Sequence, residues 1–478
     1  MAVTGQAIIA LLPELIALGF AILVLLVGVF FERSVGLVAG LAAVGALAVF
    51  GSAAGLLAAG FSGEFFGGGY VVDNFALYFK LIVSGSAFFA VLAAARWSWG
   101  TGDAPEYLTL ILSVVLGSIL LVSMRDLFGI FLAIELATIP SYAMVAFDRR
   151  RRESAEGGMK YLITGVVASS VLLYGIVLIY GVSGSAELPA VAETFSGNLT
   201  PVALLGLVLL LSGFAFKVSA APFHFWAPDA YQGAPTSAAA FLSVAPKAAT
   251  FAVLLRILLE GMPEAAPTWT AVMAFLAILT MFVGNLAALR QRNVRRMLAY
   301  SSVAHSGYIL AAFAALQGQG VERAVEAVLI YSAAYAVMNI GAFLVIDLVG
   351  EDGKSFNGLF RSRPALAASM GVFMASLVGI PPFSGFWGKA WIIFSGAESG
   401  SVLVYVVVGA LVVNSVLSVP YYFGIIRNMF FEKPAMDAVE PSGGGALKFS
   451  VYVLALLTAL FFLLIVPISA IAGGSGLG

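Results

Sequence analysis

The chain has 478 residues, of which 61% are hydrophobic and only 10% are charged. Soluble domains carry about 25% charged residues, so this composition excludes a water-facing globular protein and indicates a polytopic membrane protein. Basic and acidic residues nearly balance, at 24 and 25, which gives no indication of a nucleic-acid partner. Cysteine is absent, so disulfides, iron–sulfur clusters and thiolate zinc sites are excluded. No G-x-G-x-x-G or Walker A motif occurs, so any nucleotide or redox chemistry belongs to another chain.

Fourteen apolar stretches are long enough to cross a bilayer core of about 30 Å, which takes about 20 helical residues. They lie at residues 8–31, 35–58, 73–95, 106–123, 127–147, 159–182, 201–221, 235–259, 269–290, 300–317, 322–348, 366–396, 402–427 and 448–472. The sequence therefore predicts an all-α polytopic membrane protein. The first stretch has no Lys or Arg before it, unlike a secretory signal, so a retained helix with its amino terminus outside is expected.

Basic residues are distributed unequally between the two sets of loops that this topology creates. The outer connections hold only Arg125 and Arg323. The inner loops hold Arg33, Arg96, Arg149, Arg150, Arg151, Arg152, Lys160, Arg290, Arg292, Arg295, Arg296, Lys354, Arg361, Arg363, Arg427, Lys433 and Lys448. Loops on the cytoplasmic side of a membrane are enriched in Lys and Arg, so both termini are expected on the opposite, outer side.

Two of the predicted spans contain related interruptions. Residues 213–226 read GFAFKVSAAPFHFW, and residues 378–389 read VGIPPFSGFWGK. An interior proline breaks or kinks a helix, and unpaired backbone within a membrane needs protein or water around it. These are spans seven and twelve, and an odd separation inserts the two copies in opposite directions, as in the inverted repeats of transporters. The alternative is two unrelated proline kinks.

Four charged residues lie deep within predicted spans: Glu135, Lys217, Lys247 and Lys389. A charge at the bilayer centre costs about 2.5–3.5 kcal/mol on insertion scales, so these residues call for a functional explanation. One carboxylate cannot pair with three amines, and a buried amine without a counter-charge releases its proton more readily than one in water. The pattern therefore favours a proton relay. The alternative is a scaffold in which buried ion pairs only set the helix register.

Other polar groups near these spans are further candidates. His305 lies near the inner end of the tenth span and either passes protons or packs as a satisfied histidine. His224 adjoins the first interruption and is either a relay group or a cap for free backbone. Lys80 either lies deep in the membrane or reaches an interface by snorkelling, and Glu14 is expected close to the outer face.

Four sequence blocks carry a resemblance to a known family. They are FHFWAPDAYQGAPT at 223–236, FLSVAPKAA at 241–249, LAYSSVAHSGY at 298–308 and FSGFWGK at 383–389. From about residue 100 to 430, the chain resembles the antiporter-like subunits of proton-pumping NADH:quinone oxidoreductase (respiratory complex I). Among these it is most similar to the subunit N type. The grounds are the block PDAYQGAP at 228–235, Lys389 where the M type carries Glu, and the absence of a long carboxy-terminal lateral helix like that of the L type. Gln232 departs from the Glu more often expected there.

The resemblance implies an architecture and a role for each charged residue. Three amino-terminal helices (1–100) precede a five-helix repeat (101–260, helices 4–8), an inverted five-helix repeat (261–430, helices 9–13), and a loop with the last helix (431–478). Helices 7 and 12 are broken. Glu135 pairs with Lys217, and Lys247 and Lys389 continue a hydrated proton path driven by quinone reduction in other subunits.

The resemblance also implies partners and a location. No cofactor is bound by this chain, and NADH, FMN, iron–sulfur clusters and quinone are expected in partner subunits. The neighbours are the K, J and A types on one side and subunit M on the other, within the lipid of a bacterial inner membrane. A large subunit of a multisubunit sodium/proton antiporter, which shares the fold and the Glu/Lys pair, is the alternative.

Overall fold

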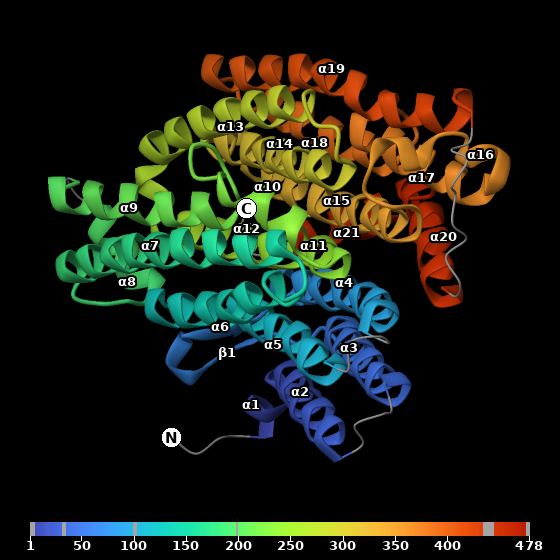
Figure 1. The fold of residues 1–478 in the computed structure, drawn as a ribbon. Coiled ribbons are helices and arrows are strands. Elements are labelled where there is room, and N and C mark those ends of the chain that lie inside the picture. Colours follow the sequence, from blue (N-terminus) through green and yellow to red (C-terminus); the bar gives the residue numbers. More distant parts are fainter. Residues whose placement is uncertain (1–4, 31–34, 99–102, 197–198, 434–443, 475–478) are drawn as a thin grey trace.

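The computed structural model describes the chain except for residues 1–4, 31–34, 99–102, 197–198, 434–443 and 475–478. Helices make up nearly all of the described part, and they pack side by side along a shared direction (Figure 1). The amino-terminal part contains α1 (Gly5–Ala10), α2 (Leu12–Phe30), α3 (Val35–Ala58), β1 (Gly63–Phe65), η1 (Phe66–Gly68), β2 (Tyr70–Val72) and α4 (Asn74–Ser98). The strands β1 and β2 form a small antiparallel hairpin that connects α3 to α4.

The helices that follow contain the first interrupted segment. They are α5 (Ala104–Ser123), α6 (Leu127–Val145), α7 (Arg152–Ser183), α8 (Leu188–Phe195), α9 (Pro201–Lys217), α10 (Trp226–Gly233), α11 (Thr236–Leu242), α12 (Ala245–Arg256) and the single π-helical turn η2 (Ile257–Gly261). Helix α9 begins with Pro201 after Thr200, whose hydroxyl accepts the N–H of Ala203 at 3.2 Å. A capping threonine followed by proline is a strong helix start.

The remaining helices contain the second interruption. They are η3 (Pro263–Ala265), α13 (Ala266–Ala288), α14 (Val294–Ala314), η4 (Gly318–Gly320), α15 (Val321–Val349), η5 (Gly353–Phe356), α16 (Leu359–Ser362), α17 (Pro364–Val378), α18 (Ser384–Glu398), α19 (Val402–Phe431), α20 (Gly445–Ala459) and α21 (Phe462–Gly473). Helix α17 ends at Val378 and is followed by Gly379, whose φ of 97° suits a residue without a side chain. The diproline Pro381-Pro382 separates it from α18.

Ten helical segments of the described chain are long and apolar enough to span a membrane, or up to eleven if the bent pair α20 and α21 counts as one span. The prediction of an all-α polytopic membrane protein is therefore confirmed. Three predicted spans fall outside this set for physical reasons. The stretch 201–221 contains only the 17-residue α9, and 366–396 divides into two 15-residue helices. The stretch 300–317 lies in α14, which carries three serines and a histidine between Ser301 and Ser306.

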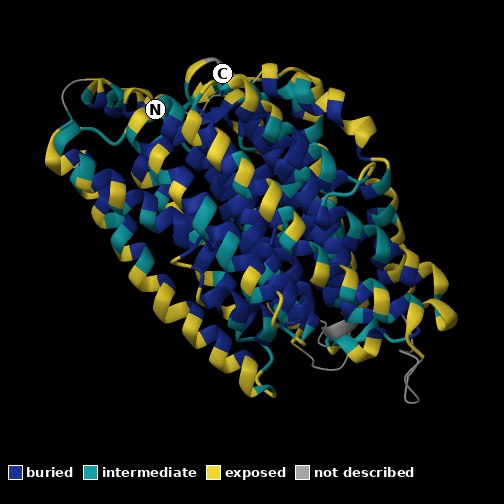
Figure 2. Ribbon diagram, turned by 90° about the horizontal axis from the view of Figure 1, so that it is seen from above, coloured by how far each residue is buried: buried dark blue, intermediate teal, exposed yellow. Residues whose placement is uncertain are grey.

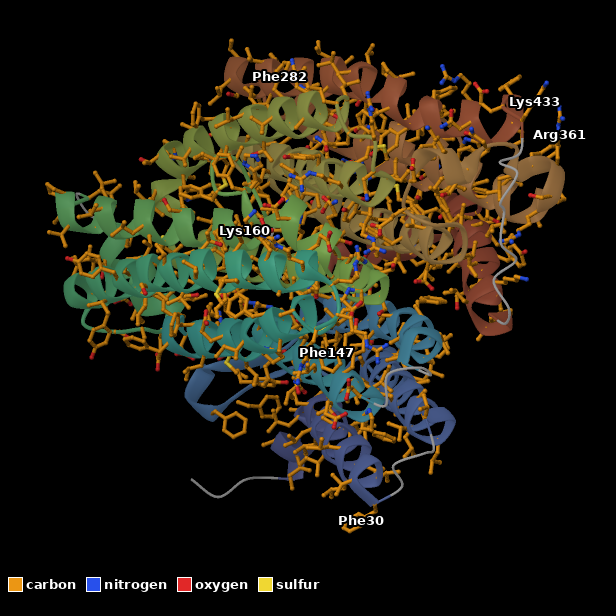
Figure 3. All side chains as sticks on the ribbon, in the orientation of Figure 1. Phe30, Phe147, Lys160, Phe282, Arg361 and Lys433 are labelled. Carbon is orange, nitrogen blue, oxygen red and sulfur yellow. The ribbon has the colours of Figure 1, made fainter. Side chains whose placement is uncertain are left out.

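Burial follows the pattern of a membrane bundle. Figure 2 shows buried residues in the interior and exposed residues concentrated on the outer helices. Nearly all of α15 is buried, whereas α2, α7 and α19 expose large apolar side chains such as Leu26, Val167 and Val416. Apolar side chains on that outer surface are suited to lipid or to apolar partner helices. Figure 3 shows the charged side chains of Arg361 and Lys433 at one end of the bundle.

Small residues allow two helix pairs to approach closely. A Cβ atom added to Gly117 of α5 would lie 2.4 Å from the backbone nitrogen of Ala137 in α6. A Cβ atom added to Gly284 of α13 would lie 2.5 Å from the backbone nitrogen of Ala304 in α14. Membrane helices commonly use glycine in this way, because backbone packing replaces the hydrophobic driving force of water. These contacts hold α6 and α14, the helices that carry Glu135 and His305, against their neighbours.

Candidate functional site

Glu135 and Lys217 form a partly buried ion pair between α6 and the end of α9. The Nζ atom of Lys217 lies 3.1 Å from Oε1 of Glu135, and their side chains are 6% and 20% exposed. Two hydroxyl groups complete the site: Ser169 donates to the same carboxylate oxygen at 2.6 Å, and Lys217 donates to Ser169 at 3.0 Å and to Thr138 at 3.2 Å. The carboxylate therefore has both a cationic and a neutral hydrogen-bond donor.

The position of Lys217 in its helix explains part of this arrangement. Lys217 is the last residue of α9, and the chain leaves the helix immediately after it. The final carbonyl groups of a helix lack intrahelical partners and carry partial negative charge, which favours a cation nearby. The interruption thus provides a polar setting for an amine within an otherwise apolar span.

A small cavity adjoins Lys217. It has a volume of about 20 Å³, and its polar lining comes from Ser118, Thr138, Ser141, Tyr161, Lys217 and Thr250. About 10–15 Å³ with several polar partners suffices for one water molecule. Thr250 belongs to α12, one turn beyond Lys247, so the cavity extends from the ion pair towards the next lysine.

Lys247 lies in a hydroxyl-rich, buried setting at the start of α12. The helix begins after an interruption at Ser243 and Val244, and Lys247 is in its first turn. The Nζ atom donates to Oγ of Ser302 at 2.8 Å and to Oγ of Ser306 at 3.3 Å. Lys247 is 3% exposed and forms no ion pair with the residues that the structure describes. Neutral hydroxyl groups are therefore its main hydrogen-bond partners.

His305 lies on the same helix as these serines, with a tyrosine at each ring nitrogen. Its Nδ1 is 2.8 Å from the hydroxyl of Tyr331, and its Nε2 is 3.2 Å from the hydroxyl of Tyr422. The residue is 1% exposed. Because a neutral imidazole has one donor and one acceptor nitrogen, this pair of hydroxyls can exchange hydrogen-bond direction together with the ring tautomer.

Lys389 reaches back across the second interruption. It lies in α18, and its Nζ atom donates to the carbonyl oxygen of Val378 at 2.7 Å and to that of Leu377 at 3.3 Å. These are free carbonyls at the end of α17, so the amine again lies at a helix carboxyl terminus. Its Nζ atom is 4.6 Å from the ring centroid of Tyr308, a distance typical of a cation–π contact.

Helix α14 connects the two lysines that lack a carboxylate. Ser302 and Ser306 contact Lys247, and Tyr308 contacts Lys389. At a rise of about 1.5 Å per residue, positions 302 to 308 cover about 9 Å of this helix. A second cavity of about 10 Å³ lies beside Lys247, with Ser306, Ser332 and Tyr335 in its lining. Polar groups on α14 thus extend along the whole interval between the two amines.

His224 lies apart from this row of residues. It is buried at the first interruption, and its Nδ1 has no hydrogen-bond partner in the part of the chain that the structure describes. Its ring lies 4.5 Å from that of Phe225. Among the six residues singled out from the sequence, α14 joins Lys247, His305 and Lys389 through its side-chain contacts, and Glu135 pairs with Lys217, whose adjoining cavity reaches Thr250 of α12. No contact of the described residues joins His224 to these groups.

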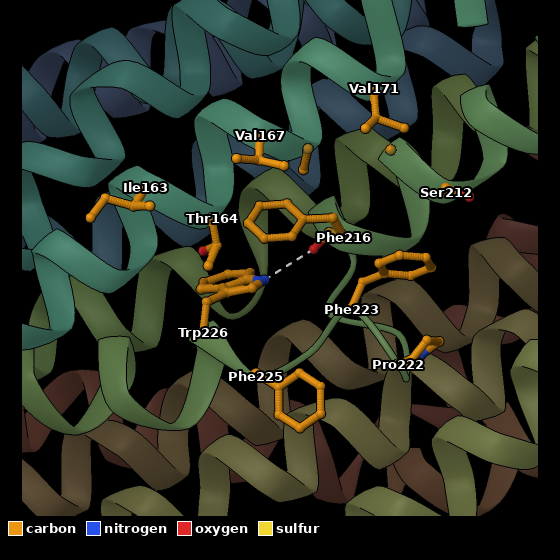
Figure 4. Close-up of a pocket in the computed structure, with 12 residues that line it drawn as sticks. Ile163, Thr164, Val167, Val171, Ser212, Phe216, Pro222, Phe223, Phe225 and Trp226 are labelled. Carbon is orange, nitrogen blue, oxygen red and sulfur yellow. Dashed lines mark hydrogen bonds between the residues drawn. The ribbon is translucent and has the colours of Figure 1, made fainter.

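An apolar pocket lies between α7 and the first interruption (Figure 4). Its volume is about 310 Å³, and its lining includes Phe216, Pro222, Phe223 and Trp226 but no titratable side chain. The Nε1 of Trp226 donates to the carbonyl oxygen of Phe216 at 3.2 Å, so it satisfies a group freed by the end of α9 (Figure 4). None of the proposed relay residues lines this pocket.

Another ion pair, in which both side chains are buried, was not predicted from the sequence. The Nζ atom of Lys80 lies 2.6 Å from Oε1 of Glu14 and 2.9 Å from the hydroxyl of Tyr70. Lys80 is fully buried, so snorkelling to an interface is excluded. Glu14 and Lys80 are far apart in the sequence and lie on different helices, α2 and α4, and no local pattern indicates their contact.

A chain of ion pairs joins several loop and helix ends near α12. Arg256 pairs with Asp73 at 2.8 Å and with Glu260 at 2.6 Å, and Glu260 also pairs with Arg125, which contacts Glu64. Partial burial opposes the charging of Arg125, but the two carboxylates outweigh it and raise the pKa of its guanidinium group. No group of three or more His, Asp or Glu residues suited to a metal ion occurs among the described residues.

Comparisons with known proteins agree with this architecture. A family model described as NADH:quinone oxidoreductase/Mrp antiporter, TM, matches residues 124–418. NADH-quinone oxidoreductase subunit N of Rubrobacter xylanophilus is 75% identical over 480 residues, which cover 100% of both chains. A chain of respiratory complex I from Thermus thermophilus with bound aureothin has a TM-score of 0.82 at 32% identity, over 97% of this chain and 100% of that one. A chain of the Mrp complex from Dietzia sp. has a TM-score of 0.85 at 21% identity, over 98% of this chain and 97% of that one, which shows a common fold.

The fold and the family match define an antiporter-like membrane protein involved in proton translocation. Its sequence identity to a subunit N of NADH-quinone oxidoreductase is 75%, whereas its sequence identity to the Mrp chain is 21%. The chain belongs to the subunit N family of NADH-quinone oxidoreductase, and it is a membrane-arm subunit of the proton-translocating complex I. It therefore acts within a hetero-oligomer.

Proposed function

We propose that this subunit moves protons along the row Glu135, Lys217, Lys247, His305 and Lys389, driven by quinone reduction in other subunits. The observation that carries the proposal is the arrangement of the partly buried Lys217 and the buried Lys247 and Lys389, each at a helix interruption, with hydroxyl groups and small cavities between them. Helix interruptions in transporters serve to present polar groups at the membrane midplane. Intramembrane ionisable groups are functional in most known cases.

The ion pair acts as the switch of this relay. While Glu135 lies beside Lys217, the carboxylate stabilises the charged amine. A movement that separates the two removes this stabilisation, and the amine then releases its proton towards Lys247. Lys247 has only hydroxyl partners and passes the proton through Ser302, Ser306 and the groups of α14. His224 is left out of this route because no described contact joins it to the row.

The proposed architecture has fourteen spans with two inverted five-helix repeats, at 101–260 and 261–430. In each broken segment an amine lies at the carboxyl end of the first half-helix: Lys217 is the last residue of α9, and Lys389 of α18 donates to the carbonyl oxygen of Val378 at the end of α17. The close packing of Gly117 against α6 recurs at Gly284 against α14, which are the fourth with the fifth and the ninth with the tenth span. This recurrence supports the repeat and gives broken helices 7 and 12 equivalent roles.

The proposed orientation follows the distribution of basic residues. We infer that the loops rich in Lys and Arg face the cytoplasm of a bacterial inner membrane and that both termini face the periplasm. NADH, FMN, iron–sulfur clusters and quinone are assigned to partner subunits, which agrees with the absence of cysteine. Subunits of the K, J and A types on one side and subunit M on the other are the proposed neighbours.

The test replaces Lys217 and Lys247 by alanine in separate variants of the assembled complex. Proton pumping in vesicles is measured together with NADH oxidation, and Lys433→Ala, which removes an exposed lysine at the end of the bundle, is the matched control (Figure 3). The proposal expects less pumping per NADH oxidised in both variants and no change in the control. Unaffected pumping in both variants would leave an inert scaffold as the better account.

A further inference from the structure

A cavity outside the relay lies between the ends of several helices. Its volume is about 360 Å³, and it is bounded by the α13–α14 connection, by η5 and by the last turns of α19. Both α13 and α19 are membrane spans by length and composition, so the cavity lies where spans end and basic loops begin. This is the depth at which lipid headgroups meet a membrane protein.

Positive charge dominates the rim of this cavity. Arg292, Lys354 and Arg427 come from three separate segments and line it, and all three are exposed. Arg292 and Lys354 form no ion pair with the residues that the structure describes, and Arg427 lies 4.0 Å from Glu432. The single carboxylate in the lining, Asp352, accepts the backbone N–H of Lys354 at 3.0 Å and so stabilises the loop.

Apolar side chains form the floor. Val294, Met297, Tyr421 and Ile425 are buried and line the cavity inside the exposed basic rim, and the exposed Leu289 lies at its edge. A cationic rim above an apolar floor matches a molecule with an anionic head and a hydrocarbon tail. A free inorganic anion has no hydrocarbon tail and would gain nothing from contact with the apolar side chains.

Hydrogen bonds hold the walls of the cavity together. The N–H of Gly353 donates to the carbonyl oxygen of Arg292 at 3.3 Å, and the side chain of Asn428 donates to the carbonyl oxygen of Gly353 at 3.2 Å. The N–H of Val294 donates to the carbonyl oxygen of Glu351 at 2.8 Å. The three segments are thus connected before any ligand arrives, which lowers the entropic cost of binding.

We propose that this cavity binds an anionic phospholipid, with its phosphate among Arg292, Lys354 and Arg427 and an acyl chain over the apolar floor. Guanidinium and ammonium groups are the usual partners of phosphate, and basic pockets between membrane helices bind anionic headgroups. The same three cations repel hydronium, so the charge of the rim disfavours a proton entrance here.

A lipid in this cavity would support one of the relay lysines. The hydroxyl of Tyr421 donates to Oδ1 of Asn285 at 2.9 Å, and Nδ2 of Asn285 is 3.1 Å from the hydroxyl of Tyr308. The ring of Tyr308 contacts Lys389. The lipid site is therefore connected to Lys389 through two hydrogen bonds and one ring contact, so a bound lipid would help to fix the position of this amine. Lipid binding itself does not depend on the proposed relay.

The test measures phospholipid binding to the purified, assembled complex. Wild type, Arg292→Gln/Lys354→Gln and the charge-matched control Arg361→Gln/Lys448→Gln are exchanged into phosphatidylcholine micelles, then titrated with phosphatidylglycerol, and bound lipid is counted by mass spectrometry. A third variant, Gly424→Phe, fills the cavity without changing charge, since a Cβ atom at Gly424 meets nothing within 4 Å. Inorganic phosphate serves as the headgroup without a tail.

We expect the double variant to bind phosphatidylglycerol about tenfold or more weakly than wild type, because two basic contacts are lost. Gly424→Phe should lose the same bound lipid, and the control should match wild type. Equal affinity in all four proteins, or an equal loss in the control, would overturn the proposal. Displacement of the lipid by inorganic phosphate at matching concentrations would also overturn it, since it would show an anion site without a role for the tail.

Discussion

The Nζ atom of Lys217, the last residue of α9, lies 3.1 Å from Oε1 of Glu135 in α6, and Ser169 of α7 donates to that same oxygen. Three helices thus meet at one carboxylate oxygen. A small relative movement of any of them changes the distance between the two charges. Coulomb energy falls with distance and is stronger in a poorly hydrated interior than in water, so this pair is sensitive to conformational change.

Replacing Glu135 by glutamine keeps the shape of the side chain and removes its charge. A hydrogen bond to a charged group contributes about 1.5–3 kcal/mol, so we expect proton delivery through this site to slow by roughly tenfold or more. The measurement is pumping per NADH oxidised in vesicles that contain the assembled complex. Glu156→Gln, which removes the partner of a largely exposed pair with Lys160, is the control and should pump normally. Equal pumping by both variants would argue against a switch at Glu135.

Lys389→Met retains a long side chain and removes the amine that bonds the carbonyls of Val378 and Leu377. We expect a pumping defect similar in size to that of Glu135→Gln. We also expect the carboxyl end of α17 to open more often, because the amine no longer holds its last carbonyl groups. Proton pumping and hydrogen exchange of the α17 carboxyl end are the measurements. Lys448→Met, at an exposed position, controls for the substitution itself. A variant that pumps like the control would remove Lys389 from the route.

Tyr331→Phe keeps the aromatic ring of residue 331 and deletes one of the two tyrosine hydroxyls that are hydrogen-bonded to His305. An ordinary hydrogen bond is worth about 0.5–1.5 kcal/mol, so transfer past His305 should slow by about two- to tenfold. Tyr78→Phe deletes a hydroxyl that donates to the carbonyl of Leu329 at 2.9 Å, and this buried control should lose stability without a loss of pumping. A pumping defect of equal size in both variants would indicate general destabilisation and not proton transfer.

Gly117→Ala tests the close approach of α5 and α6. The added Cβ atom would lie 2.4 Å from the backbone of Ala137, so the helices must separate. Overpacking of this kind costs about 1–3 kcal/mol. Less assembled complex and a lower thermal midpoint are expected. Gly51→Ala, where nothing lies within 4 Å, should have no such effect, since alanine is favoured over glycine in a helix by about 0.5–1 kcal/mol.

Much of the fold could be predicted from the sequence because membrane spans have a simple physical signal. Length and apolar content locate the spans, and the prolines at 222, 381 and 382 indicate where two of them break. The same criterion is weakest for α14, which carries Ser302, His305 and Ser306 where a lipid-facing span would carry apolar residues. That helix is buried, and its polar groups face the lysines.

The contacts between helices that are distant in the sequence were harder to predict. Lys247 and Lys389 stand out as charges without a nearby partner, but nothing in the sequence indicates that α14 lies between them. The pair of Glu14 with Lys80 could not be predicted, because the two residues lie on different helices, α2 and α4, that are far apart in the sequence. Long-range pairing depends on how helices pack, and packing has no local sequence pattern.

A proton relay requires that a hydrated path inside the membrane joins Lys217, Lys247 and Lys389. The most direct test is a map of the assembled complex at a resolution that shows ordered water. We expect water in the cavities beside Lys217 and Lys247, within hydrogen-bond distance of their amines, with contacts that lead towards Thr250 and Ser306. Dry cavities, or amines turned outward to lipid headgroups, would contradict it.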